Sequence, residues 1–158
     1  MTRLLRIAVL ATTVCFAAPA FSQDKPADNM QILLDKIKAD KKLLVAENMN
    51  LTEEEAKGFW PLYEAYQKDL GQLNTRTKKA IKAYADAYNK GPVPDQTAKP
   101  LLDEALAIED AEVQLKRSYV PKLEKVLPTA KVARYIQIEN KIRSAIKYQL
   151  ASEIPLIE

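Results

Sequence analysis

The side chains that most often carry enzyme chemistry are scarce in this sequence. Its 158 residues contain no His and one Cys, Cys15, which lies in an apolar N-terminal run. The usual general bases and thiol nucleophiles are therefore missing from the rest of the chain. Gly58, Gly71 and Gly91 are too scattered to form a phosphate-binding loop. We predict no enzyme activity and no cofactor.

Carboxylates are the remaining candidates for acid–base chemistry. Glu109, Asp110 and Glu112 are close enough in sequence for two of them to form a catalytic pair. A long helix with a solvated acidic face explains this cluster better, because charged residues along a helix usually face water. We therefore expect these three carboxylates to be exposed.

Basic residues are concentrated near the C-terminus. Residues 116–147 contain nine basic and two acidic side chains, whereas residues 23–115 are net acidic. Two interpretations remain open: the oppositely charged helices pair with each other, or a basic patch binds acidic unfolded proteins, anionic lipid headgroups or a negative sensor domain. The candidate surface consists of Lys116, Arg117, Lys122, Lys125, Arg134, Lys141, Arg143 and Lys147.

The first 22 residues have the layout of a secretory signal peptide. Arg3 and Arg6 precede an apolar run that is too short for a comfortable membrane span, and small residues follow. We expect cleavage after Ser22, with Ala20 as the second choice, and export to the periplasm. Nucleic acid is therefore not an expected partner. An uncleaved anchor is the alternative.

Apolar residues recur at helical spacing along the remaining chain, and no stretch alternates with period two. The pattern predicts an all-α fold, with a flexible polar leader at residues 23–28 and one helical domain at 29–158. A seven-residue repeat from Phe59 to Ala87 indicates one long helix, Glu53 to about Asn89. A second long helix follows from about residue 102 through 126.

These two long helices are joined by a short segment containing Gly91 and two prolines, so they must pair antiparallel as a hairpin. Shorter helices flank the hairpin on both sides. A heptad stripe of this length predicts a homodimer, unless the flanking helices fold back and cover the stripe. Four tyrosines outside the repeat are candidates for exposed contacts: Tyr88, Tyr119, Tyr135 and Tyr148.

Two prolines are expected to bend the hairpin. Pro61 lies well past the first helical turn and removes one backbone hydrogen bond, while Gly58 lowers the cost of bending. Pro121 lies at nearly the same distance from the turn on the partner helix. Matched kinks predict a curved hairpin, with Trp60 filling the bend.

The start of the first long helix resembles a known sequence motif. Thr52 and Glu55 form a capping box, in which each side chain bonds the backbone of the other residue. With Leu51 they give "NLTEEEAKGF", which is similar to the LTxxQ motif of the Spy/CpxP-like periplasmic proteins. Glu55 stands where that family has Gln.

A second, weaker copy of the motif lies at the other end of the hairpin, in "VLPTAKVARY". Leu127 matches, Pro128 replaces Thr, and Lys131 replaces Gln. A hairpin whose tip lies midway between the copies would bring them side by side at its open end, as in that family. The resemblance covers the architecture of most of the mature chain, and about ten residues at each motif.

The resemblance implies a cradle-shaped dimer of bent helical hairpins. It also implies one of two functions: an ATP-independent chaperone for unfolded envelope proteins, or a regulator of an envelope stress sensor. Family members that bind zinc, copper or nickel use clusters of His and Met, whereas this chain keeps only Met30 and Met49 after cleavage. We therefore expect no such metal site. A weak contact with an anionic membrane surface is a further possibility from the basic residues.

Overall fold

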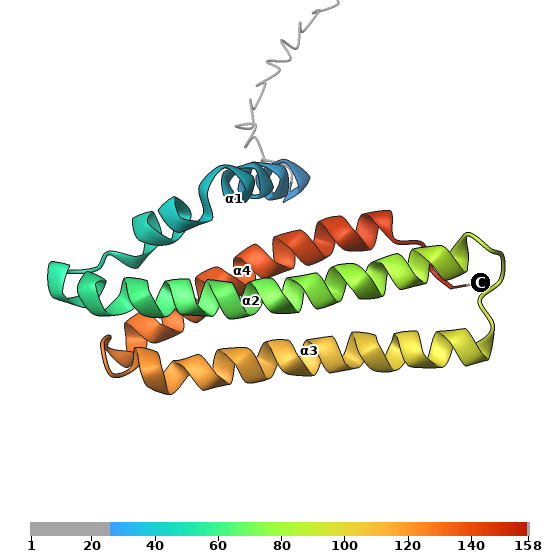
Figure 1. Cartoon of the computed structure of the whole chain (residues 1–158). Helices are drawn as coiled ribbons and strands as arrows, with labels where there is room; N and C mark the ends of the chain where they lie inside the picture. Colours follow the sequence, from blue (N-terminus) through green and yellow to red (C-terminus); the bar gives the residue numbers. More distant parts are fainter. Residues whose placement is uncertain (1–25, 158) are drawn as a thin grey trace, which may run out of the picture.

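The computed structural model consists of four helices (Figure 1). It describes the backbone of residues 26–157, and the side chains of Ile37 and residues 39–157. The helices are α1 (Pro26–Met49), α2 (Glu53–Tyr88), α3 (Asp95–Leu123) and α4 (Thr129–Glu153), and this range contains no strand. The all-α prediction is confirmed for the described residues, whereas the expected signal peptide lies outside them. None of the described helices is long and apolar enough to span a membrane.

The helix boundaries differ from expectation at two places. Residues 26–28, expected in the flexible leader, already belong to α1. The second long helix ends at Leu123, and Val126 lies in the turn before α4. The capping box of α2 is present as predicted: the Thr52 hydroxyl accepts from the Glu55 N–H, and the Glu55 carboxylate accepts from the Thr52 N–H.

Helix α1 is divided by a break at Asp40, whose φ of −161° and ψ of 96° are not helical. The Asp40 carboxylate accepts a hydrogen bond of 2.9 Å from the Leu43 N–H, so it caps the second piece of the helix. The helix is followed by Asn50, which has a φ of +47°. Asn tolerates this left-handed conformation better than most residues, which explains why the chain turns here into α2.

Helices α2 and α3 lie side by side and run in opposite directions (Figure 1). Two contacts fix their register: the Tyr119 hydroxyl donates to Asp69 at 2.6 Å, and the Arg76 guanidinium donates two hydrogen bonds to Glu104. Helix α4 folds back along this pair, and α1 packs against α4.

The core is aromatic at the end where α2 begins. Tyr135 of α4 is fully buried, and its ring centroid lies 5.1 Å from that of Phe59 and 5.9 Å from that of Tyr66. Tyr119 packs edge-on against Tyr66 at 5.2 Å. Tyr119 and Tyr135 are therefore core residues rather than exposed contacts, and of the four candidate tyrosines Tyr148 is the one that is exposed, at 60 %.

Candidate functional site

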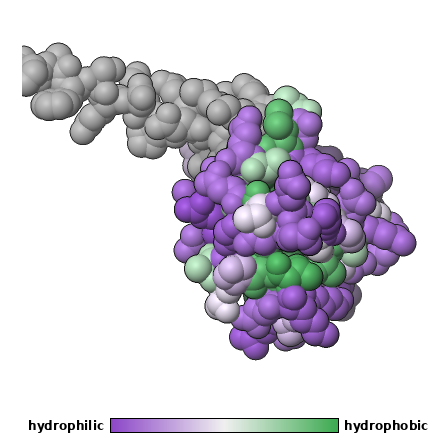
Figure 2. Space-filling view, turned by 90° about the vertical axis from the view of Figure 1, so that its left-hand side faces the viewer, coloured by the Kyte–Doolittle hydropathy of each residue, from purple (hydrophilic) through white to green (hydrophobic). Residues whose placement is uncertain are grey.

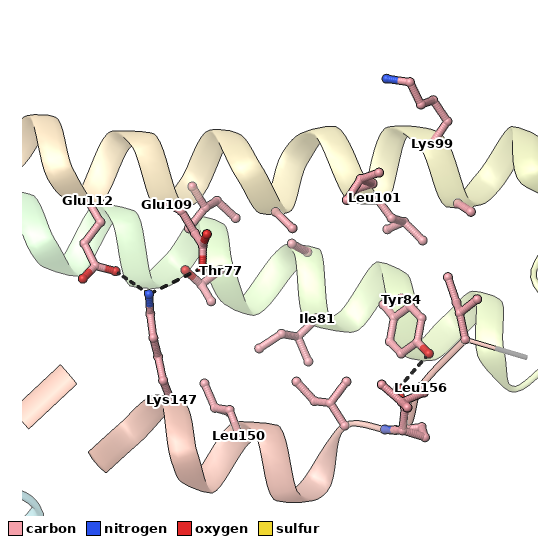
Figure 3. A pocket seen from close by; sticks show the side chains of 18 of the residues that line it. Thr77, Ile81, Tyr84, Lys99, Leu101, Glu109, Glu112, Lys147, Leu150 and Leu156 are labelled. Atoms are coloured by element: carbon pink, nitrogen blue, oxygen red, sulfur yellow. Dashed lines mark hydrogen bonds and ion pairs between the residues drawn. The ribbon is translucent and has the colours of Figure 1, made fainter. Parts of the chain in front are cut away.

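An apolar groove lies along the other half of the α2–α3 pair, away from the aromatic core (Figure 3). Its volume is about 720 Å³, and its walls come from α2, α3, the end of α4 and the C-terminal tail. This volume falls in the range of about 300–1,000 Å³ that is usual for small-molecule sites. The large apolar side chains that line it are Ile81, Leu101, Leu102, Ile108, Leu150, Ile154, Leu156 and Ile157.

Small side chains leave the space that forms this groove. Along the aromatic half, α2 presents Phe59, Tyr63 and Tyr66, whereas along the groove the small residues Thr77 and Ala80 alternate with Ile81 and Tyr84. Helix α3 contributes further alanines to the lining, Ala98 and Ala105. Two helices that pack through small residues cannot fill the volume that large side chains would occupy, so an apolar space remains between them and α4.

The C-terminal tail forms one wall of the groove. After α4 the chain continues through Pro155, whose carbonyl oxygen accepts a hydrogen bond of 2.9 Å from the Tyr84 hydroxyl (Figure 3). Leu156 nevertheless remains 87 % exposed. The tail therefore extends the apolar lining without closing the groove.

Charged side chains gather at the end of the groove nearest the aromatic core. Glu112 is only 5 % exposed and accepts hydrogen bonds from Lys116 at 3.0 Å and from Arg143 at 2.9 Å. Burial alone would raise the pKa of Glu112, but these two hydrogen bonds outweigh it and hold the pKa below its ordinary value. Glu112 was expected to face water, and this was wrong; Glu109 and Asp110 are exposed as expected.

Lys147 is the least tightly held cation at this end. Its Nζ lies 3.5 Å from a Glu112 oxygen and 3.7 Å from a Glu109 oxygen, both too long for a strong hydrogen bond (Figure 3). The side chain is 49 % exposed, compared with 14 % for Arg143. Lys147 therefore places a positive charge at the groove and can form a shorter hydrogen bond with a ligand.

A second buried carboxylate, Glu139, lies on α4 beside a small polar cavity of about 140 Å³. It accepts hydrogen bonds of 2.8 Å from Lys41 and from Gln67. The Tyr66 hydroxyl lines the same cavity and has no hydrogen-bond partner among the described residues. Burial raises the pKa of Tyr66, so this hydroxyl stays protonated.

The eight predicted surface cations do not form one patch. Lys116, Arg143 and Lys147 surround Glu112. Arg143 and Lys147 come from α4, as the pairing interpretation expects, whereas Lys116 lies on α3 together with Glu112. The Lys122 Nζ lies 4.2 Å from the centre of the Tyr119 ring, and Arg134 donates a hydrogen bond to the Asn48 carbonyl. The remaining three cations are exposed and form no ion pair with any described residue: Arg117, Lys125 and Lys141.

The two motif copies meet at the end of the molecule where α2 begins. The Lys131 ammonium donates to the Glu55 carboxylate and, at 2.9 Å, to the Asn50 carbonyl. Leu127 is 4 % exposed, and Leu51 packs against the same core. Viewed from this end, the molecule shows an apolar patch between hydrophilic side chains (Figure 2).

The residues predicted to bend the hairpin lie on α2 and α3. Pro61 and Pro121 are both exposed, on α2 and α3 respectively, and both helices continue through them. The bend itself stays a prediction. Gly58 has a second role, because a Cβ at this position would lie 2.8 Å from the Cβ of Val126. Trp60 is half-buried rather than enclosed, with the Lys42 Nζ 5.2 Å from its ring centre.

An exposed apolar stripe runs along α3 and shares Leu102 with the groove. Leu102, Leu106 and Val113 are 56 %, 53 % and 46 % exposed. They are separated by four and seven residues, so they share one face of the helix. The sequence pattern did not predict this stripe, because Leu106 and Val113 lie outside the repeating apolar positions of the second long helix.

The two buried carboxylates were also missed, although the sequence carries a signal for them. Glu112 follows Ile108 by four residues and precedes Leu115 by three, and Glu139 stands in the same relation to Tyr135 and Ile142. Both therefore occupy places on an apolar helical face, where a charged residue indicates a buried ion pair.

Comparison with known proteins does not identify a family or a function for this chain. No model of a protein family, no curated protein and no solved structure matches the chain.

Proposed function

We propose that this protein is an exported, ATP-independent chaperone that holds unfolded envelope proteins in the periplasm, as the Spy/CpxP resemblance implies. The observation that carries the proposal is the apolar stripe of Leu102, Leu106 and Val113 on α3. Large apolar side chains that are exposed together on one face often mark an interaction site.

Charged residues next to the stripe support broad rather than narrow recognition. Glu109 and Asp110 lie between Leu106 and Val113 in sequence, and the exposed Arg117 follows. A surface of alternating apolar and charged groups binds many unfolded segments weakly, because few of its contacts require a defined partner shape.

We also propose that the chain works as a cradle-like homodimer of bent hairpins. Large apolar side chains stay exposed on α1, α3 and α4, among them Leu43, Leu106 and Tyr148, which supports a second copy that covers part of this surface. Light scattering at micromolar concentration should give twice the mass of the mature chain. A monomer at every concentration tried would remove the cradle from the proposal.

The direct test is suppression of aggregation of two unrelated denatured proteins by the mature chain without ATP. Leu106→Ser should weaken this activity, because it removes the centre of the stripe. Leu43→Ser is the matched control, since Leu43 is 54 % exposed but lies on α1. Equal activity of both variants would show that the stripe is not the client surface.

A regulator of an envelope stress sensor is the second candidate. The exposed cations Arg117, Lys125 and Lys141, which have no ion pair to a described residue, favour a negatively charged partner domain. Absence of activity on both denatured proteins would favour this alternative.

A further inference from the structure

We propose that the groove between α2, α3, α4 and the C-terminal tail binds a single-chain carboxylate amphiphile, such as a long-chain fatty acid. The acyl chain would lie along the groove and the carboxylate would meet Lys147. This inference does not depend on the chaperone proposal, because the groove shares only Leu102 with the stripe on which that proposal rests.

The groove has the length of an acyl chain. Its lining on α3 runs from Asp95 to Glu112. That span corresponds to about 26 Å at 1.5 Å per residue. One acyl chain of a bilayer needs about 15 Å, since two of them span a hydrocarbon core of about 30 Å. A single extended chain therefore fits with room for its headgroup.

The polar groups of the lining favour an acyl chain over a polypeptide segment. The two hydroxyls of the lining already have partners: Thr77 donates to the Leu73 carbonyl at 3.1 Å, and Tyr84 donates to the Pro155 carbonyl. The neighbouring lining is aliphatic, including Ile81 and Ala105. An enclosed peptide backbone would need hydrogen-bond partners along its length, whereas an acyl chain needs none.

The charge at the inner end favours an anionic headgroup. Of the charged groups at this end, Glu109, Glu112, Arg143 and Lys147 line the groove. Lys116 lies outside the lining and pairs with Glu112 from there, so the five groups together sum to +1. Glu112 is fixed by its hydrogen bonds with Lys116 and Arg143. Lys147 therefore remains available, and a ligand carboxylate would give it the short charge-assisted hydrogen bond that it lacks here.

Substitutions of Lys147 and of its neighbour Glu109 should change the affinity for the ligand in opposite directions. Lys147→Gln should weaken dodecanoate binding about tenfold, the change expected for loss of one charge-assisted hydrogen bond. Glu109→Gln should strengthen it, because the exposed Glu109 carboxylate competes with the ligand for Lys147.

The test is calorimetric titration of the mature chain with dodecanoate, and with dodecyltrimethylammonium as a chain of equal length and opposite charge. Ala105→Trp should abolish binding by filling the groove, and Ala83→Trp, on the exposed face of α2 outside the lining, is the matched control. Circular dichroism establishes that each variant is folded.

The site would be supported if dodecanoate binds saturably and 1:1, if Ala105→Trp abolishes this binding, and if Ala83→Trp leaves it unchanged. The proposal would be overturned by absence of binding below the micellar concentration, by equal affinity for the cationic chain, or by effects of the same sign in Lys147→Gln and Glu109→Gln. Loss of aggregation suppression in Leu106→Ser with unchanged dodecanoate binding would separate this site from the client surface.

Discussion

Glu55 and Lys131 form an ion pair between corresponding positions of the two motif copies. The motif that these two segments resemble has Gln at both positions, whereas this chain has a pair of opposite charges there. The contact ties the first turn of α2 to the first turn of α4. Lys131 also bonds the Asn50 carbonyl, so the same side chain holds the end of α1 in place.

Replacement of both residues by Gln should therefore show coupling. Glu55→Gln and Lys131→Gln should each lower the urea midpoint of unfolding, and the double variant should lower it by less than the sum, since the second change removes a partner already lost. Lys125→Gln, which alters an exposed lysine without an ion pair to a described residue, is the control. Additive effects would show that the two motif copies are not energetically linked.

Stability should fall in acid because of the paired carboxylates. The hydrogen bond from Lys131 lowers the pKa of Glu55, and the pKa of Glu112 also lies below its ordinary value of 4.5. A carboxyl group with a lowered pKa in the folded state stabilises the fold above the unfolded-state pKa and loses this effect as the pH falls through the folded-state value. The urea midpoint should thus be flat between about pH 6 and 8 and decrease below about 4.5.

Glu112→Gln identifies the contribution of the buried carboxylate to this acid sensitivity. The variant should be less stable at neutral pH, because Arg143 loses its charged partner, and its midpoint should change less between pH 6 and 3. Asp110→Gln, at a neighbouring exposed position, should show the same change of urea midpoint with pH as the unaltered protein. An unchanged slope in Glu112→Gln would locate the acid sensitivity elsewhere.

Gly58 and Gly71 should respond in opposite ways to alanine, although both lie inside α2. Gly71→Ala should stabilise the protein by about 0.5–1 kcal/mol, since nothing lies within 4 Å of the added methyl group. Gly58→Ala should cost about 1–3 kcal/mol, because its methyl group would overlap Val126. Urea denaturation measures both changes. Val126→Gly in the Gly58→Ala background should recover part of the loss, and failure to do so would argue against this contact.

The two prolines give a test of shape. Replacing Pro61 and Pro121 by Ala restores two helical hydrogen bonds at exposed positions, so helix content and melting temperature should hold or rise. Aggregation suppression should nevertheless decrease if it depends on a curved hairpin. Pro100→Ala, at a third exposed proline within α3, controls for the gain in helix stability. Full activity of the double variant would show that curvature is not required.

Trp60→Ala should cost less than a core substitution. The indole is half-buried, against Phe59 and Tyr63 on one side and below Lys42 on the other. We expect a loss of about 2 kcal/mol in urea denaturation, compared with about 3–5 kcal/mol for a fully buried aromatic side chain. Trp60→Phe should recover most of it. A loss in the full-burial range would mean that α1 covers the indole more completely.

The sequence predicted the helices well because each carries a repeating apolar face and a local stop signal. The turn after α2 contains Gly91, whose φ of +118° suits glycine, and the start of α2 has its capping box. These are local effects, which the neighbouring residues determine.

The groove was not predictable in the same way. It depends on which residues of α3 and α4 face Thr77 and Ala80 across the bundle, and on where the C-terminal tail returns. Likewise, Glu112 looked like part of a solvated acidic face until Lys116, Arg143 and Lys147 were placed around it. Such contacts join residues far apart in sequence, so periodicity alone carries little information about them.

The change from aromatic to alanine-rich packing along α2 and α3 has a consequence for the dynamics of the bundle. Tyr66, Tyr119 and Tyr135 pack together from three helices at one end, whereas Ala80 and Ala105 border the open groove at the other. Local opening should therefore begin at the alanine-rich end, and backbone amides there should exchange with deuterium well before those near Tyr66. The aromatic end of the bundle would stay folded while the other end opens and closes locally.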